Sequence, residues 1–218
     1  MRTVGADACS DFYSSTILSR RKHVTVLLGT TSTTPEPHIA KLYNMKEIRE
    51  SSLLQFVNDP SCLHYIKHPR LLRCYGCRIN PRRDTATIFE EFGQVSLQKL
   101  ISEHRKTGKC FSESALWSVA AAVASLLQYL HQHDNKTFYN SISNNTIHLG
   151  SMVHGNLKPS NVYIVHQKDI SSFEFSDVKV THPAVCRNFG TSRNAAGKQI
   201  DELIYHAPEI LNILSTSP

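Results

Sequence analysis

The sequence predicts an α+β fold of two lobes, in which a strand-rich first third is followed by a helical region. Short runs rich in β-branched and aromatic residues recur up to residue 92. A long amphipathic pattern then fills residues 112–132, and no internal repeat interrupts this order. Two unlike lobes are expected to leave a cleft between them, which is where two-lobed proteins bind ligands.

The first lobe is predicted to contain short strands, a helical stretch and a hairpin, after a loose lead-in over residues 1–22. The expected strands are 24–28, 38–42, 71–79 and 85–92. The polar segment "NPRRD" (80–84) is expected to form the hairpin loop between the last two. A helical pattern covers residues 45–57, and Pro60 predicts a second helix start with Asp59 as its cap.

The second half is predicted to begin with one long helix over residues 112–132, which Ser112 can start. Apolar residues recur there at spacings of three and four, so one face is expected to be apolar throughout. These residues are Leu116, Val119, Val123, Leu126, Leu127 and Leu130. The Asn-rich segment 133–152 has no period and is expected to be an inserted, exposed polar loop. Two short strands joined by a long tip are predicted at 161–165 and 177–180.

Composition argues against several classes of partner. The net charge of +6 and the pI near 9.0 come from scattered basic residues, which indicates a solvated surface rather than a nucleic-acid site. The six cysteines lack a framework spacing, and residues 1–20 lack the pattern of a secretory leader, so reduced thiols are expected. The longest apolar stretch, 115–130, is interrupted by polar residues and is too short to cross a bilayer.

The segment "VHGNLKPSN" (153–161) resembles the catalytic loop of eukaryotic protein kinases, V-H-R-D-L-K-P-x-N, at the same spacing. Other segments resemble further motifs of that family in the same order: "HIAK" (38–41), the linker "IKHPRLL" (66–72), the hinge and following helix "IFEEFGQVSLQKLI" (88–101) and the A-P-E segment "YHAPEIL" (205–211). The Lys-Pro pair is similar to serine/threonine kinases and, at a finer level, to NimA-related (NEK) kinases.

This resemblance covers residues 24–211 and implies a bilobal protein-kinase-like fold. It places a β-rich N-lobe at residues 23–92 and a partial helical C-lobe at residues 93–218, cut short after the A-P-E segment. It also implies a role for each matched position. The implied catalytic residues are His154, Asn156 (in place of the base Asp) and Lys158. The implied cofactor-binding residues are Gly29, Lys41, Asp59, Glu91 and Asn161. The implied metal residues are Asn161 and His182, and the activation segment holds Ala207, Pro208 and Glu209.

Several positions depart from the family pattern. The amide of Asn156 has no useful basicity, whereas general-base assistance contributes about 10²- to 10⁴-fold. His182 stands where the family has its Mg²⁺-binding Asp, and an imidazole nitrogen is a poor ligand for this hard cation. Only Gly29 remains of the expected Gly-rich loop, and Gly155 replaces the arginine that would bind a phosphorylated activation loop.

Three alternatives stay open on the sequence. Asp59 can be either a helix cap or the ion-pair partner of Lys41. Asp177 could replace the missing metal ligand if the strand register shifted, although this shift would also move the buried face of the strand. A zinc set is conceivable, with buried thiols and surface histidines as the other interpretation. That set would be His64, His68, Cys74 and Cys77.

We therefore expect a pseudokinase that serves as an interaction or scaffold module, with weak or no ATP binding and no bound Mg²⁺. Its expected partners are proteins rather than nucleic acid or membrane, and its expected location is the cytoplasm, with cytoskeletal association or the nucleus as further options. The alternative is an active ATP-dependent serine/threonine kinase with atypical motifs, which Lys41, Lys158 and Asn161 support. A degenerate fragment without an autonomous fold is the third option.

Overall fold

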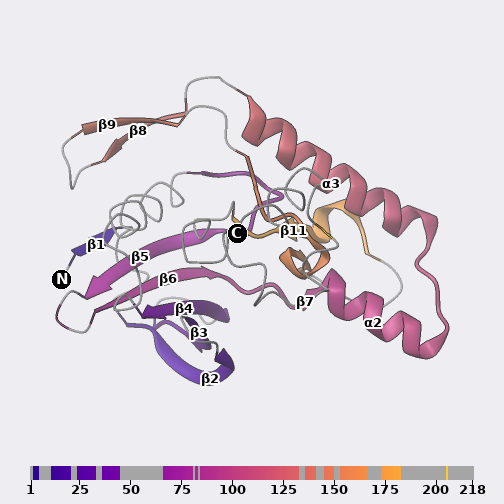
Figure 1. Cartoon of the computed structure of the whole chain (residues 1–218), viewed down its shortest axis with the longest axis horizontal. Coiled ribbons are helices and arrows are strands. Elements are labelled where there is room, and N and C mark those ends of the chain that lie inside the picture. Colours follow the sequence, from indigo (N-terminus) through magenta and orange to yellow (C-terminus); the bar gives the residue numbers. More distant parts are fainter. Residues whose placement is uncertain are drawn as a thin grey trace, which may run out of the picture.

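The computed structural model, shown in Figure 1, is an assembly of sheets and two long helices. The residues that it describes are 2–4, 11–20, 24–32, 36–44, 66–80, 82, 84–132, 136–140, 145–149, 153–165, 173–182 and 205. The expected helices after residue 45 and at Pro60 lie outside the described residues, as do Asp59 and the three residues Ala207, Pro208 and Glu209 of the A-P-E segment.

The N-terminal part is built on a six-stranded antiparallel sheet in the order β1-β5-β6-β4-β3-β2. Its strands are β1 (Arg2–Val4), β2 (Tyr13–Arg20), β3 (Val24–Thr30), β4 (His38–Asn44), β5 (Cys74–Asn80) and β6 (Thr85–Glu91). The four strands expected from β-branched and aromatic runs are confirmed, and the connection between β5 and β6 falls at the predicted hairpin. The lobe is thus β-rich, as predicted.

The prediction of a loose lead-in over residues 1–22 is wrong, because β1 and β2 lie within it. β2 pairs along its length with β3, and β1 pairs with β5. The described side chains of β2 are exposed, so its sequence carries no alternation between buried and solvated positions. Main-chain pairing with β3, interrupted by two register shifts, is what orders this edge strand.

Alternation along β4 and β6 gives the sheet two different faces. Lys41 pairs with Ile88, and Ile39 pairs with Glu90, so these four side chains share one face. That face joins the main core, which continues into the helical part. The opposite face carries the smaller cluster of Ala40 and Phe89, against which Phe12, Leu27 and Tyr75 pack.

The C-terminal part combines two helices with two small sheets. Its elements are β7 (Val95–Ser96), α2 (Leu97–Thr107), α3 (Glu113–His131), β8 (Lys136–Asn140), β9 (Asn145–Leu149), the short η3 (Pro159–Asn161), β10 (Val162–Ile164), the short η4 (Phe175–Asp177) and β11 (Val178–Val180). β10 lies between β11 and β7, which confirms the two predicted short strands. The backbone from β6 through β7 into α2 matches the expected hinge and following helix.

The prediction that residues 133–152 form a loop without regular structure is wrong for residues 136–140 and 145–149, because β8 and β9 pair there as an antiparallel hairpin. The segments "KTFYN" and "NTIHL" each place β-branched or aromatic residues among polar ones. The high Asn content masked that pattern in the sequence. Figure 1 shows the hairpin projecting away from the small sheet that contains β10 and β11.

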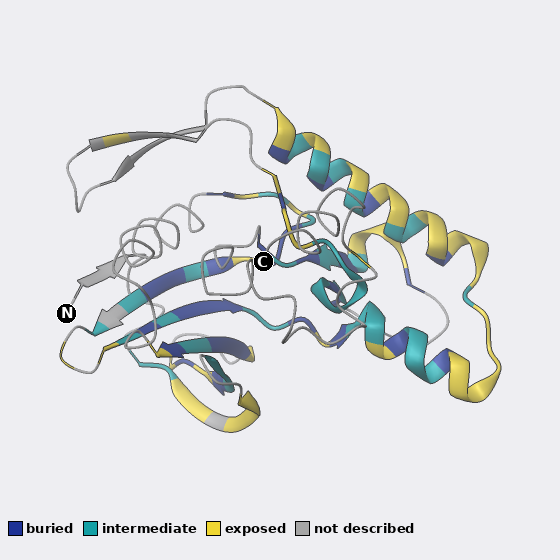
Figure 2. Cartoon of the chain, in the orientation of Figure 1, coloured by how far each residue is buried: buried dark blue, intermediate teal, exposed yellow. Residues whose placement is uncertain are grey.

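The predicted long helix is confirmed as α3, and its expected start is confirmed as well. The Ser112 hydroxyl accepts a hydrogen bond from the Ala115 backbone N–H at 3.2 Å. The apolar face is narrower than expected, since Leu116 is 57% exposed whereas Leu126 and Leu130 are buried. Figure 2 shows this division into an exposed and a buried side along the helix, which packs on η4 and β11.

Neither described helix has the combination of length and apolarity needed to cross a membrane.

Candidate functional site

The loop over residues 153–161 is pinned to the end of β11 by the buried side chain of His154. Its Nε2–H donates to the backbone carbonyl of Thr181 at 2.9 Å, and its Nδ1 accepts from the Asn156 N–H at 3.4 Å. Burial lowers the pKa of His154, and the bond to Thr181 only partly opposes this shift. A neutral imidazole therefore anchors this loop.

Two further residues shape the loop around Asn156. Gly155 has a φ of 70°, in the left-handed region that side chains disfavour. The Asn161 side-chain amide donates to the Asn156 carbonyl at 2.7 Å, and the Asn161 carbonyl accepts from the Thr181 N–H at 2.9 Å. Asn156 is itself exposed, and Lys158 is half-buried directly before η3. Asn161 thus closes the loop with both its side chain and its backbone.

Lys41 forms an ion pair that the sequence did not predict. Its Nζ lies 2.5 Å from Oε2 of Glu90, which belongs to β6 and whose side chain is only 6% exposed. Glu90 shares the sheet face of Lys41 because Lys41 pairs with Ile88, two residues before Glu90. Burial by itself would raise the pKa of Glu90, but the charges of Lys41 and His182 and the bond from Lys41 outweigh it and lower that pKa. Glu90 is therefore an ionised, buried carboxylate.

His182 completes a buried cluster with Lys41 and Glu90, two residues after the end of β11. Its Nδ1 lies 3.8 Å from Glu90 Oε1, too far for a hydrogen bond, and both ring nitrogens are buried without a hydrogen-bond partner among the described residues. Burial, together with the nearby charge of Lys41 and with His154, lowers the pKa of His182 to about 4, although Glu90 and Glu91 oppose the shift. The cluster at neutral pH therefore contains one cation, one anion and a neutral imidazole.

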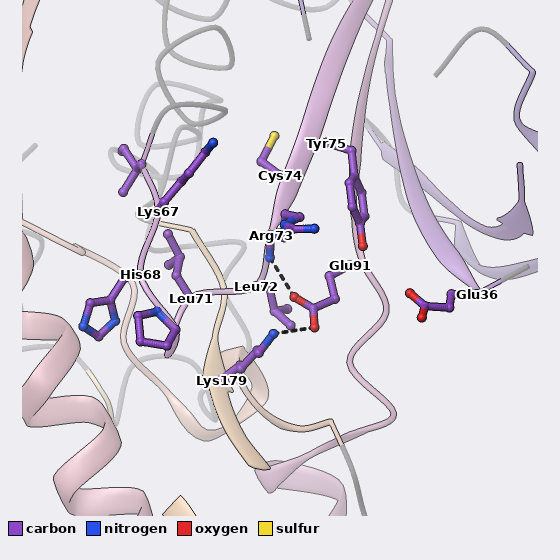
Figure 3. Close-up of a pocket in the computed structure, with 12 residues that line it drawn as sticks. Glu36, Lys67, His68, Leu71, Leu72, Arg73, Cys74, Tyr75, Glu91 and Lys179 are labelled. Atoms are coloured by element: carbon purple, nitrogen blue, oxygen red, sulfur yellow. Dashed lines mark hydrogen bonds and ion pairs between the residues drawn. The ribbon is translucent and has the colours of Figure 1, made fainter. Parts of the chain in front are cut away.

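Glu91 points to the other side of β6 from Glu90, as alternation along a strand requires. Its carboxylate accepts a hydrogen bond from the Arg73 backbone N–H at 2.9 Å and pairs with Lys179 Nζ at 2.5 Å. Figure 3 shows both interactions converging on Glu91. Because Lys179 belongs to β11, Glu91 ties the large sheet to the small one.

Gly29 does not lie where a Gly-rich loop between two strands would place it. It sits near the end of β3 that leads to β4, away from the connection between β2 and β3. A Cβ on Gly29 would lie 2.2 Å from the Tyr13 carbonyl oxygen and 2.5 Å from the Phe12 ring. A glycine is required here because β2 and Phe12 approach this closely. The prediction that Gly29 binds phosphate is therefore wrong.

The register shift that could have let Asp177 replace the missing metal ligand does not occur. β10 and β11 pair Val162 with Val180 and Ile164 with Val178, which buries both valines of β11. The Asp177 carboxylate instead accepts from the Glu174 backbone N–H at 2.9 Å, as part of a capping box. A one-residue slip would break this box and turn Lys179 into the core.

The zinc alternative also finds no arrangement to support it. Cys74 and Cys77 are buried on β5, and the His68 ring stacks on Tyr129 with centroids 5.0 Å apart. In the described part of the chain, no three His, Cys, Asp or Glu side chains are grouped as a metal ion would need. His64 lies outside that part.

The structure thus brings together Lys41, Glu90 and His182, and it joins His154, Asn156 and Asn161 in the neighbouring loop. Sequence reasoning missed Glu90, although the pair of glutamates at the end of a predicted strand was a usable signal. One of two consecutive residues at such a place faces the core, and a carboxylate there needs a counter-ion. Lys41, on the adjacent strand, supplies it.

Comparison with known proteins identifies relatives of this arrangement. Residues 18–217 match the family described as "Protein tyrosine and serine/threonine kinase". The chain is 25% identical over 166 residues to the probable serine/threonine-protein kinase nek2 of Dictyostelium discoideum, covering 75% of this chain and 36% of nek2. It is 32% identical over 123 residues to human Wee1-like protein kinase 2, covering 53% of this chain and 18% of the relative. The chain therefore spans about a third or less of the length of these curated relatives.

Solved structures share the fold. The kinase domain of maize sucrose-induced receptor kinase 1, bound to AMP-PNP, superimposes with a TM-score of 0.55 at 20% identity, covering 81% of this chain and 52% of that domain. The kinase domain of Mycobacterium tuberculosis PknI gives a TM-score of 0.57 at 13% identity, covering 82% of this chain and 60% of that domain. At these identities the likeness concerns the fold.

Proposed function

The chain belongs to the protein tyrosine and serine/threonine kinase family, and from this premise we propose that it is a pseudokinase. In this proposal the kinase-like fold serves as an interaction module for protein partners and does not transfer phosphate from ATP. The observation that carries the proposal is the buried pairing of Lys41 with Glu90, beside a neutral His182.

In this family the lysine at the position of Lys41 contacts nucleotide phosphates. Here the ammonium is the counter-ion of a carboxylate that is nearly inaccessible to solvent. A phosphate that took Lys41 away from Glu90 would leave a buried, unpaired charge, which costs about 3–5 kcal/mol. A penalty of this size weakens binding by roughly two to four powers of ten. The proposal therefore includes weak or no ATP binding.

The positions matched to the catalytic base and the metal ligand support the same conclusion. Asn156 is exposed, but its amide cannot take a proton from a substrate hydroxyl. His182 is buried, and the amide of Asn161 already donates to the Asn156 carbonyl. A divalent cation needs several oxygen ligands, and at these two positions it would find an imidazole and only one side-chain oxygen, Oδ1 of Asn161, whose Nδ2 donates to Asn156. We accordingly propose that Mg²⁺ is not bound.

Within the family, we propose kinship with the NimA-related (NEK) kinases, which rests on the Lys-Pro pair of "LKPSN" and on the likeness to nek2 of D. discoideum. We also propose that the partners are proteins, not nucleic acid or membrane, and that the protein acts in the cytoplasm, with the cytoskeleton or the nucleus as the further locations to examine.

A thermal melt with ATP, in either Mg²⁺ or EDTA, tests the proposal. A nucleotide at a hundred times its dissociation constant would add about 2.7 kcal/mol and raise the melting temperature by roughly 5–10 °C. We expect no Mg²⁺-dependent shift, and at most a small shift that is indifferent to metal. A Mg²⁺-dependent shift, with phosphate transfer to a protein substrate that Lys41→Met abolishes, would overturn the pseudokinase proposal.

The structural role of Lys41 can be separated from a nucleotide-binding role by a double-mutant cycle. Lys41→Met alone should destabilise the fold by about 3–5 kcal/mol, because Glu90 would keep a buried charge without its partner. Lys41→Met combined with Glu90→Leu should recover most of this loss, because the buried charge is then removed as well. Urea denaturation of the parent, the single variants Lys41→Met and Glu90→Leu, and the double variant measures the cycle. Equal instability of Lys41→Met and of the double variant would contradict the proposed counter-ion role.

A further inference from the structure

A pocket of about 800 Å³ lies at the end of β6, where Glu91, and not the adjacent Glu90, forms part of its lining. Its floor includes Leu71 and Leu72, and its edge is formed by the start of β5, the end of β6 and Lys179 of β11. This volume is within the range of sites that hold small molecules or a few side chains. Figure 3 shows the pocket with Glu91 and Lys179 meeting at its wall.

Some of the charged side chains that line the pocket form ion pairs, and others do not. Glu91 is neutralised by Lys179 and by the Arg73 backbone N–H. The side chains of Lys67 and Arg73 are exposed, and in the described part of the chain neither forms an ion pair. Glu36 is the remaining lining carboxylate, and it lies on the opposite side of Glu91 from Lys67 (Figure 3). The half of the pocket near Lys67 and Arg73 is therefore positively charged.

The chemistry of that half is mixed. Leu71 and Leu72 are buried beneath it, Pro69 is exposed beside it, and His68 is held uncharged because burial and then the charge of Arg70 lower its pKa. An apolar floor with two unpaired cations at the mouth suits an apolar side chain that is flanked by carboxylates. A basic ligand would meet Lys67 and Arg73 with like charge.

We propose that this pocket is the docking site for an acidic peptide segment of a partner protein, which inserts an apolar side chain over Leu71 and Leu72 and places carboxylates beside Lys67 and Arg73. This inference deepens the proposed function, since it rests on the chain being an interaction module and names the surface and the chemistry of the partner. The pocket shares no residue with the cluster of Lys41, Glu90 and His182.

Selection of binders to the purified chain from a random-sequence peptide library tests the proposal. We expect the selected peptides to combine Asp or Glu with a Leu, Ile or Phe. Their affinity should fall about ten- to a hundredfold in the variant Lys67→Glu/Arg73→Glu, and it should weaken as ionic strength rises. The matched control is Lys99→Glu/Lys109→Glu, which changes the same formal charge at exposed positions outside the pocket and should leave affinity unchanged.

A second selection on Lys67→Glu/Arg73→Glu makes the test independent of folding losses, because that variant should now enrich basic peptides if it melts like the parent. Three results would overturn the proposal. The selected peptides could bind both proteins equally, the acidic peptides could depend on Lys99 and Lys109, or no acidic sequence could be enriched. Phosphate transfer from ATP would overturn the pseudokinase proposal alone, since the peptide selections contain no nucleotide.

Discussion

At the residue scale, Gly155 stands where the family has arginine, and it adopts a backbone conformation that favours glycine. Its φ of 70° belongs to the left-handed region, where a Cβ approaches the following carbonyl oxygen. The loop on either side is held by His154 and Asn161, so the backbone cannot relax freely. A glycine therefore fits the observed backbone of this loop better than an arginine would.

We predict that Gly155→Arg, which restores the family residue, destabilises the fold by about 1–2 kcal/mol. Gly155→Asn should cost less, because Asn tolerates the left-handed conformation better than other side chains do. Chemical denaturation of the two variants measures the difference. Equal stability of Gly155→Arg and the parent would show that the loop adopts another conformation in solution.

His182 should make the protein acid-sensitive. Its pKa is about 4 in the fold and about 6.5 in the unfolded chain, so only the unfolded chain gains a proton as the pH falls between these values. Stability contributed by neutral His182 is therefore present above pH 6.5 and is lost as the pH falls towards 4, by roughly 3 kcal/mol.

Urea denaturation at a series of pH values from about 7 down to about 4 spans both pKa values. The free energy of unfolding should fall over this range in the parent, and it should fall less in His182→Leu. His154 and His68 also have lowered pKa values and contribute to both proteins, so the difference between the two curves isolates His182. Parallel curves would mean that His182 is solvated in solution.

At the scale of elements, α3 is a helix whose burial differs sharply along its apolar residues. Leu126 and Leu130 are almost fully buried in the main core, whereas Leu116 and Trp117 are exposed near the N-terminus of the helix. Spacing alone could not separate these residues, since Leu116 lies on a plausible apolar stripe. The side of the helix that is covered decides it: Ala115, beside Leu116, is fully buried in the same core as Leu126, and α3 packs on η4 and β11.

Leu126→Ala should destabilise the protein by about 2–5 kcal/mol, because it leaves a cavity in a packed core. Leu116→Ala should change stability by no more than about 0.5 kcal/mol, because the side chain is already largely in water. The two substitutions remove the same atoms from the same helix, so melting of both variants compares burial directly. A large effect of Leu116→Ala would indicate that this side of the helix is covered in solution.

At the scale of the whole molecule, Glu91 connects the six-stranded sheet to the small sheet of the second part. It pairs with Lys179 of β11, and both side chains are about one-fifth exposed. The adjacent Glu90 is bound to Lys41 within the large sheet. Consecutive residues of one strand therefore serve two different tasks, one inside a lobe and one between lobes.

A double-mutant cycle on Glu91→Gln and Lys179→Met should give a coupling energy of about 1–2 kcal/mol, since the pair is partly shielded from water. The exposed pair Lys99–Glu103 on α2, with its charged atoms 3.9 Å apart, is the internal control and should couple by no more than about 0.5 kcal/mol. Equal coupling in the two cycles would show that Glu91 does not tie the two parts together.

The sequence by itself determined the family and much of the architecture. Local patterns were sufficient for β3, β4, β5, β6, α3, β10 and β11, because β-branched runs, caps and helical spacing act within a few residues. The motif in residues 153–161 identified the loop and its differences from the family pattern at Gly155 and Asn156, since these differences can be read directly from the residues at those positions.

Only the tertiary structure decided how those residues are used. The pairing of Lys41 with Glu90 depends on which face of β6 is buried and on the register between β4 and β6, and neither is encoded locally. The placement of Gly29 under Phe12 and the strand β2 depend equally on pairing between distant segments. The sequence is sufficient to identify candidate side chains of a site, but the partner of a buried charge depends on which residues the fold brings next to it.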